Sequence, residues 1–128
     1  MDTPKLTLSL LPEKFGICRL DENTPIPEWA KEESSLTSIT VTDGELSIVC
    51  PQEKIPGGVM YEKDWRAFKL ETVLDISSVG IVASLSKPLA DEKISIFYIS
   101  TYETNYLLVE DKEVEKSKKV LGKFCVIK

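Results

Sequence analysis

The chain has 128 residues, which suffice for one compact domain or two very small ones. It carries 21 acidic and 16 basic residues, for a net charge of −5. Because the basic residues are scattered among acidic ones, the chain gains little from binding the phosphates of DNA or RNA. No stretch reaches 18 consecutive apolar residues, and the first residues lack the basic-then-apolar pattern of a secretory signal. We therefore expect a cytoplasmic protein without nucleic-acid or membrane partners.

Residue types that commonly carry catalysis or hold metals are scarce. The chain has no histidine, the commonest general base near neutral pH and the commonest metal ligand. Cys18, Cys50 and Cys125 lie far apart, each inside an apolar run, which is typical of buried core cysteines; a catalytic thiol is the second interpretation. There is no phosphate-binding glycine loop and no paired carboxylate motif. The sequence predicts no enzyme, no cofactor and no metal site.

Strands dominate the first half of the chain. Two apolar runs around Asp43-Gly44 predict a β-hairpin, since this dipeptide is a strong short-range hairpin signal. A segment with two prolines and two glycines, residues 51–58, is the best internal boundary. We expect an N-terminal unit over residues 1–60 and a C-terminal unit over residues 61–128. The elements expected in the first half are strands at 6–11, 15–20, 37–42 and 45–50 and a short helix at 27–31.

The second half alternates strands and helices. A strand at 64–71 precedes a helix in which Val82, Leu85 and Leu89 share one face, with Pro88 interrupting its hydrogen bonds. A strand follows at 94–100, with Ile94, Ile96 and Tyr98 on one face. A strand at 105–110, a helix from Asp111 to Gly122 and a strand at 124–127 complete the order. This βαββαβ order predicts an α+β, ferredoxin-like unit, and the first half is interpreted as a degenerate copy of it.

Three segments carry a family resemblance. They are Val79–Ala90, in which a glycine opens a helix that ends in Pro-Leu-Ala, the apolar strand of residues 94–102 that runs into Ser-Thr-Tyr, and residues 105–109. Together they resemble ACT domains of the CASTOR type. The resemblance implies two tandem ACT units that pack sheet edge to sheet edge and bind an amino acid or related metabolite at the interface between units.

The candidate site combines this resemblance with the physics of a helix start. By position, Ser84 matches the ligand-facing helix, Gly80 and its neighbours match the loop that opens it, and residues 98–101 match the ligand-facing strand end. Unpaired N–H groups at a helix start favour a carboxylate, and polar groups at a strand end can accept from an ammonium. The arginine sensors have aspartate where this chain has Asn105, which disfavours a cationic ligand such as arginine. The candidate ligand-binding residues are Ser78, Val79, Gly80, Ile81, Ser84, Tyr98, Ile99, Ser100, Thr101 and Asn105.

Each candidate residue also has a structural interpretation. Gly80 could serve helix packing, Ser77 and Ser78 could be helix N-caps, and Ser100 and Asn105 could belong only to a strand end and its turn. At the level of function, the main hypothesis is a non-catalytic regulatory protein that binds an amino acid. The alternative is a ligand-free structural or adaptor module for dimerisation, and an enzyme on the same scaffold is a third. A homodimer is expected because association would cover exposed sheet edges.

Overall fold

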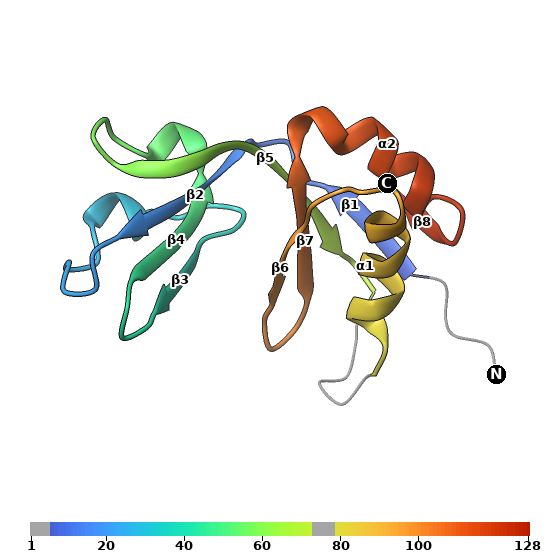
Figure 1. Cartoon of the computed structure of the whole chain (residues 1–128), viewed down its shortest axis with the longest axis horizontal. Helices are drawn as coiled ribbons and strands as arrows, with labels where there is room; N and C mark the ends of the chain where they lie inside the picture. Colours follow the sequence, from blue (N-terminus) through green and yellow to red (C-terminus); the bar gives the residue numbers. More distant parts are fainter. Residues whose placement is uncertain (1–5, 73–78) are drawn as a thin grey trace. The chain divides into compact units, whose positions relative to one another are not determined.

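The computed structural model describes residues 6–72 and 79–128 (Figure 1). The chain divides into two units. Residues 1–11 and 66–128 form the outer unit, and residues 12–65 form the inserted unit. The strands are β1 (Leu6–Leu10), β2 (Phe15–Leu20), β3 (Ser38–Val41), β4 (Leu46–Pro51), β5 (Met60–Leu70), β6 (Phe97–Ser100), β7 (Asn105–Glu110) and β8 (Cys125–Ile127). The helices are α1 (Ile81–Asp91) and α2 (Val114–Leu121), and the 3₁₀ turns are η1 (Glu28–Ala30), η2 (Gln52–Lys54) and η3 (Asp111–Glu113).

The position of β1 differs from the division expected at residues 60 and 61. That division placed the first strand in the N-terminal unit, whereas β1 lies in the outer unit. It pairs antiparallel with β5, with Leu8 opposite Leu70, and parallel with β8, with Leu6 opposite Cys125. The inserted unit thus begins only after Leu11, and β5 contributes its first half to that unit and its second half to the outer unit.

The outer unit consists of strands in the order β6-β7-β5-β1-β8 with both helices. Its elements follow the expected order β5-α1-β6-β7-α2-β8, so the α+β, ferredoxin-like fold expected from the sequence is confirmed. Side chains of α1 and α2 pack with alternate residues of the strands into one core. Its buried members are Leu6, Leu8, Phe68, Leu70, Leu85, Leu89, Ile94, Leu107, Val109, Val114, Val120, Leu121 and Cys125.

The buried face of α1 is displaced by one residue from the expected one. Leu85 and Leu89 are fully buried as predicted, but Val82 is 46% exposed, and Ile81 packs on the core in its place. Ile81, Leu85 and Leu89 are spaced by four residues, so they also share a helix face. Pro88 lies inside the helix, as expected, and supplies no N–H to the carbonyl group of Ser84.

The inserted unit carries its strands in the order β3-β4-β2-β5, all antiparallel. The β3–β4 hairpin confirms the prediction from Asp43-Gly44, and the Thr42 hydroxyl fixes its turn by accepting the N–H groups of Gly44 and Glu45 at 3.1 and 3.0 Å. The core of this unit contains Cys18, Cys50 and residues of η1. All three cysteines are buried, as the apolar runs around them predicted.

Among the described residues, neither helix combines the length and the hydropathy that crossing a bilayer requires.

Candidate functional site

Gly80, at the N-cap of α1, has no side chain that could cap the backbone N–H groups of the first helical turn. Gly80 occupies the N-cap position with φ +79°, a left-handed conformation that glycine adopts at little cost. The first bond within the helix runs from the N–H of Ser84 to the carbonyl oxygen of Gly80 at 2.9 Å. The N–H groups of Ile81, Val82 and Ala83 precede that bond, so they have no partner within the helix. These donors and the positive end of the helix dipole form a setting that suits a carboxylate.

The remaining side chains of this turn contribute little polarity of their own. Val79 is 89% exposed, and Ile81 packs on the core. The Ser84 hydroxyl donates to the carbonyl oxygen of Gly80 at 2.7 Å, so it bonds within its own helix. Ser77 and Ser78, which were expected as N-caps or ligand contacts, lie outside the described residues, and the N-cap position belongs to Gly80.

The polar candidates at the strand end bond to one another in the β6–β7 hairpin. Ser100 lies opposite Asn105, and its hydroxyl donates to Oδ1 of Asn105 at 2.7 Å. Thr101 closes the turn, because its Oγ1 accepts the N–H of Thr104 at 3.1 Å. The Thr104 hydroxyl, which sequence reasoning did not single out, donates to the carbonyl oxygen of Leu70 at 2.5 Å and ties the hairpin to the end of β5. In the sequence, only the position of Thr104 three residues after Thr101, across a turn, indicated that Thr104 could make such a contact.

The two parts of the candidate site lie at the same end of the outer unit, where α1 begins and the β6–β7 hairpin turns (Figure 1). Tyr98, Ser100 and Asn105 share the sheet face on which α1 packs, because strand residues alternate between faces and Tyr98 contacts the helix-side core. Ile99 points to the opposite face of β6, and Thr101 belongs to the turn that follows.

Tyr98 carries the one buried hydroxyl among these candidates. Its oxygen is enclosed and has no hydrogen-bond partner in the described part of the chain. Burial raises the pKa of this hydroxyl, so it stays protonated and remains a donor at neutral pH. Tyr98 borders the core next to α1, and its half-buried ring belongs to the packing of that helix.

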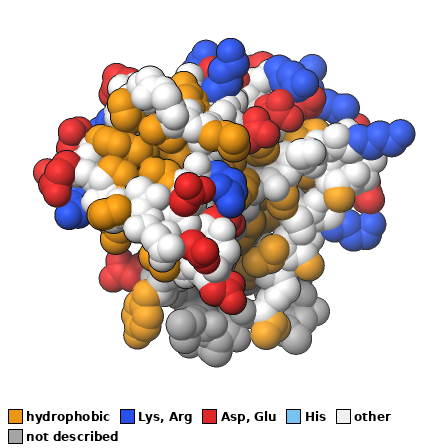
Figure 2. All heavy atoms as spheres, turned by 60° about the vertical axis from the view of Figure 1, so that its left-hand side comes forward, with side chains coloured by type: hydrophobic (Ala, Val, Ile, Leu, Met, Phe, Trp, Pro, Cys, Tyr) orange, Lys and Arg blue, Asp and Glu red, His pale blue; other side chains and the backbone are white. Residues whose placement is uncertain are grey.

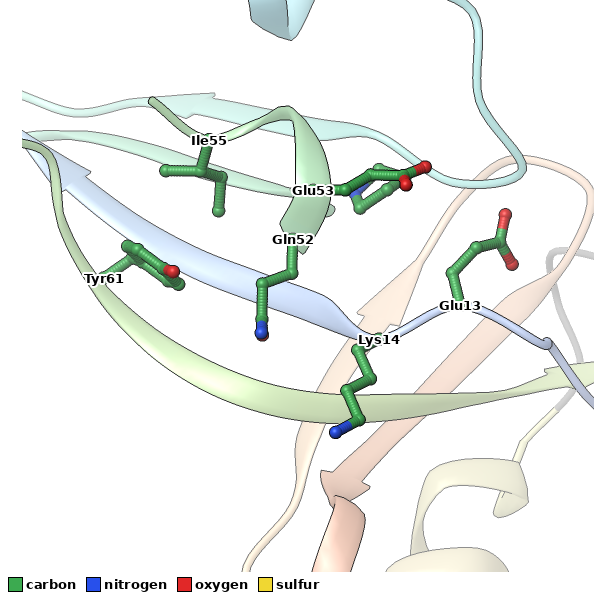
Figure 3. Close-up of a pocket in the computed structure, with 7 residues that line it drawn as sticks. Glu13, Lys14, Gln52, Glu53, Ile55 and Tyr61 are labelled. Carbon is green, nitrogen blue, oxygen red and sulfur yellow. The ribbon is translucent and has the colours of Figure 1, made fainter. Parts of the chain in front are cut away.

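A cavity of about 530 Å³ lies in the inserted unit, and none of the described candidate residues lines it (Figure 3). Ile55 and Tyr61 form one end, and Gln52 lies between them and the charged side chains. Gln52 exchanges two hydrogen bonds with Asp64, and Oε2 of Glu13 accepts from Ser35 at 2.6 Å, whereas Oε1 of Glu13 is buried and has no hydrogen-bond partner among the described residues. The residues that line the cavity are Glu13, Lys14, Pro51, Gln52, Glu53, Ile55 and Tyr61.

Acidic side chains and cysteines are the groups in the described residues that could hold a metal ion or act as nucleophiles. Within residues 6–72 and 79–128, no three Cys, Asp or Glu side chains gather as a metal-binding group. Cys18 and Cys50 are in contact, and the hydrogen bond between their thiols, together with burial, raises the pKa of Cys18. A raised pKa disfavours the thiolate, which is the nucleophilic form.

Two family models match successive parts of the chain. A model described as an ACT domain matches residues 60–123, and a model of an N-terminal domain matches residues 13–58. Among curated proteins, the cytosolic arginine sensor for mTORC1 subunit 1 of Rattus norvegicus is 30% identical over 101 residues, which cover 73% of this chain and 28% of the sensor. The Mus musculus protein of the same name is 31% identical over the same shares. The chain thus spans less than a third of the length of these curated relatives.

Solved structures extend the likeness over nearly the whole chain. A crystal structure of a protein from Agrobacterium tumefaciens is 35% identical, with a TM-score of 0.91 over 98% of this chain and 94% of that one. The ligand-free regulatory subunit of aspartate kinase from Thermus thermophilus has a TM-score of 0.64 over 91% of this chain and 95% of that one. At 12% identity, this second likeness concerns the fold alone. Since the ACT model spans half of the residues, the chain belongs to the ACT domain family.

Proposed function

We propose that this protein is a non-catalytic regulatory protein located in the cytoplasm, and that it binds an amino acid or a related small metabolite where two ACT-like units meet. The names of its relatives support a regulatory role, since one is a cytosolic arginine sensor and another a regulatory subunit of aspartate kinase. The protein is a tandem ACT protein of the CASTOR type in this proposal, and it acts as a homodimer.

The topology of the inserted unit supports the tandem arrangement. Its elements follow the order β2-η1-β3-β4-η2-β5, in which each helix of a βαββαβ unit is replaced by a 3₁₀ turn. Its strand order β3-β4-β2-β5 places the first and third strands at the centre, as in a ferredoxin-like sheet. We interpret the inserted unit as a second ACT-like unit whose helices have been reduced to single turns.

The glycine N-cap of α1 is the observation that carries the ligand proposal. Three N–H donors without a partner in the helix, a left-handed glycine whose Cβ would meet no described atom within 4 Å, and the positive helix end converge there. A free amino acid always offers a carboxylate, whatever its side chain, so this turn can hold the common part of the ligand. With Ser78 taken from the sequence alone, the proposed site comprises the ten candidate residues named above.

Asn105 narrows the chemistry of the ligand. The Asn105 amide is neutral, and its Oδ1 already accepts the Ser100 hydroxyl at 2.7 Å, so this position offers a ligand no negative charge. Because a cationic side chain is best stabilised by a carboxylate, a neutral amide here favours an amino acid with a neutral or acidic side chain over arginine.

A thermal-shift titration with the twenty amino acids tests the proposal. A ligand that binds only the native state stabilises it by about 2.7 kcal/mol at a hundred times its Kd, so a specific rise in Tm is expected for at least one neutral or acidic amino acid. The absence of any shift at millimolar concentration would remove the sensing function. A larger shift for arginine than for all others would contradict the role given to Asn105.

Gly80→Asp locates the site. Aspartate tolerates the left-handed conformation, and its negative charge is favourable at a helix start, so the fold should persist while the added charge repels the carboxylate of the ligand. The matched control is Gly58→Asp in the inserted unit, because Gly58 has φ +88° and equally open surroundings. The ligand-induced rise in Tm should vanish in Gly80→Asp and survive in Gly58→Asp. If it survives in both variants, the ligand binds at another site.

A ligand-free dimerisation module is the second candidate function. It is favoured by the exposed apolar residues on edge strand β3, where Ile39 is 36% and Val41 66% exposed. A dimer that forms without any amino-acid response would support this alternative.

A further inference from the structure

The cavity of the inserted unit shares no residue with the candidate site at α1 and has the size of a small-molecule pocket. Its volume of about 530 Å³ lies within the range of roughly 300 to 1,000 Å³ that such pockets occupy. Its walls come from the residues before β2, from the end of β4 through Ile55, and from the start of β5. Figure 3 shows Ile55 and Tyr61 toward one end and the carboxyl groups of Glu13 and Glu53 toward the other. The cavity therefore has an apolar end and a carboxylate end.

The apolar end depends on Gly16 of β2. A Cβ atom on Gly16 would overlap Cδ1 of Ile55 and lie 2.8 Å from Cδ2 of Tyr61, so glycine lets these two side chains close over the strand. The register of β2 with β5 also shifts between Phe15 and Ile17. Such bulges bend a strand and re-aim the side chains beside it, often next to a functional site. The backbone of β2 and β5 thus shapes the apolar wall of the cavity.

The two glutamates at the carboxylate end have acceptor oxygens to spare. Oε2 of Glu13 accepts the Ser35 hydroxyl at 2.6 Å, but its Oε1 is buried and has no hydrogen-bond partner among the described residues. Glu53 is exposed, and no hydrogen bond or ion pair joins it to another residue in the described part of the chain. A buried carboxylate oxygen without a donor costs free energy, so a donor that enters the cavity is stabilised at this end.

The basic side chains of the inserted unit are engaged with other carboxylates. Residues 12–65 contain 11 acidic and 5 basic residues, for a net charge of −6. Four of the basic residues form ion pairs: Lys14 with Asp64, Arg19 with Asp21, Lys31 with Glu28, and Lys54 with Glu32. The positive charge of the fifth, Lys63, also acts on Asp64. In Figure 3 the Lys14 side chain extends away from Glu13 and Glu53, so the charges of these two glutamates stay uncompensated.

We propose that this cavity binds a small primary amine with an apolar body. The ammonium group lies at the carboxylate end, where its three N–H donors can serve both Glu13 and Glu53. The body packs against Ile55 and the ring of Tyr61. Figure 2, which turns this side of the molecule forward, shows acidic side chains at the surface beside hydrophobic ones, and such a negative field attracts cations. The two glutamates repel a carboxylate, so this ligand differs in kind from the amino acid proposed for the site at α1.

Isothermal titration calorimetry of the full chain with 2-phenylethylamine tests the proposal. The wild-type chain is expected to bind one molecule of this amine with a Kd of about 1 mM or lower. The matched control ligand is 2-phenylethanol, which has the same body and a hydroxyl group in place of the ammonium group. It should bind about tenfold more weakly or not at all, because it cannot form charge-assisted hydrogen bonds with the glutamates.

Glu13→Gln and Glu53→Gln locate the ammonium group. Each removes one negative charge and keeps a side chain of the same size, and the amide oxygen at position 13 can still accept the Ser35 hydroxyl. Each variant should bind 2-phenylethylamine about tenfold more weakly than the wild type and keep its circular-dichroism spectrum. The matched control is Glu22→Gln, which removes the same charge from an exposed residue in the loop after β2, outside the cavity. It should bind the amine as the wild type does.

Three results would each overturn the proposal. They are no binding of 2-phenylethylamine at about 10 mM, equal affinity for 2-phenylethanol, and a loss of affinity in Glu22→Gln as large as in Glu13→Gln. Gly80→Asp should bind the amine as tightly as the wild type does, because Gly80 does not line the cavity. Amine binding and the amino-acid thermal shift therefore report separately on the cavity and on the site at α1.

Discussion

Asp64 concentrates several interactions of the inserted unit on one carboxylate. Its Oδ1 accepts the Gln52 side-chain amide at 3.1 Å and lies 3.7 Å from the ammonium group of Lys14. Its own N–H donates to Oε1 of Gln52 at 2.6 Å, and its φ of +62° is a conformation that Asp and Asn tolerate. The hydrogen bond from Gln52, followed by the positive charges of Lys14 and Lys63, lowers the pKa of Asp64.

This lowered pKa predicts how stability depends on pH. A group whose native pKa lies below its unfolded value of about 3.9 stabilises the fold above that pH, and the contribution disappears as the pH falls through the native pKa. Asp64→Asn keeps the backbone preference but removes the charge, so its urea midpoint should be lower than that of the wild type at pH 7. The difference should shrink between pH 4 and the native pKa.

At the same scale, the sequence predicted the burial of a residue only where the residues next to it in the chain determine that burial. The buried cysteines followed from the apolar residues beside them. The sequence did not predict that Ile81, rather than Val82, lies on the buried face of α1. Both residues have a helical spacing to Leu85 and Leu89, and only packing in the folded core selects between them. The hydrogen bond between Ser100 and Asn105 depends on the register of β6 with β7, which two residues in sequence do not reveal.

At the scale of elements, α1 retains a proline inside a helix of eleven residues. Pro88 provides no N–H to the carbonyl of Ser84, and its ring crowds the preceding turn. Pro88→Ala should therefore raise the free energy of unfolding by about 1 to 3 kcal/mol. Urea denaturation followed by circular dichroism measures this change.

Pro56→Ala gives the opposite sign and serves as the control for Pro88. Pro56 is exposed in the loop before β5, where replacing proline increases the freedom of the unfolded chain and should cost about 0.4 to 1 kcal/mol. A loss of stability in Pro88→Ala would mean that the proline ring contributes more by packing than its missing hydrogen bond costs.

Elements were predictable where their periodicity is regular. The alternation of apolar residues predicted a strand at 94–100, of which residues 97–100 form β6, and Asp43-Gly44 predicted the β3–β4 hairpin. The start of α1 was not predictable to the residue, since Ser77, Ser78 and Gly80 all carry helix-start signals and the N-cap is Gly80. The ligand proposal depends on that choice, because a glycine at the N-cap has no side chain of its own to accept the first N–H groups of the helix.

At the scale of the whole molecule, the place of β1 could not be predicted. Its partners lie about sixty and about one hundred and twenty residues away, and nothing in residues 6–10 distinguishes them from other strands. In the structure, Leu6 and Leu8 are buried in the outer core, and the Lys128 N–H donates to the carbonyl of Leu8 at 2.8 Å. The first strand of the chain, β1, therefore completes the sheet of the outer unit, most of which comes from the C-terminal half of the chain.

This arrangement predicts that residues 61–128 do not fold by themselves. Without β1, β8 loses the strand it pairs with, and the outer core loses Leu6 and Leu8. A chain of residues 66–128 joined to residues 1–11 restores the strand, provided that the linker is longer than the dozen residues a parallel connection needs. Urea unfolding should be cooperative for the rejoined chain and absent for residues 61–128. Replacing Leu8 by Asp in the rejoined chain should abolish folding, because it buries a charge between β5 and β8. Cooperative unfolding of residues 61–128 alone would show that the outer unit does not need the first strand.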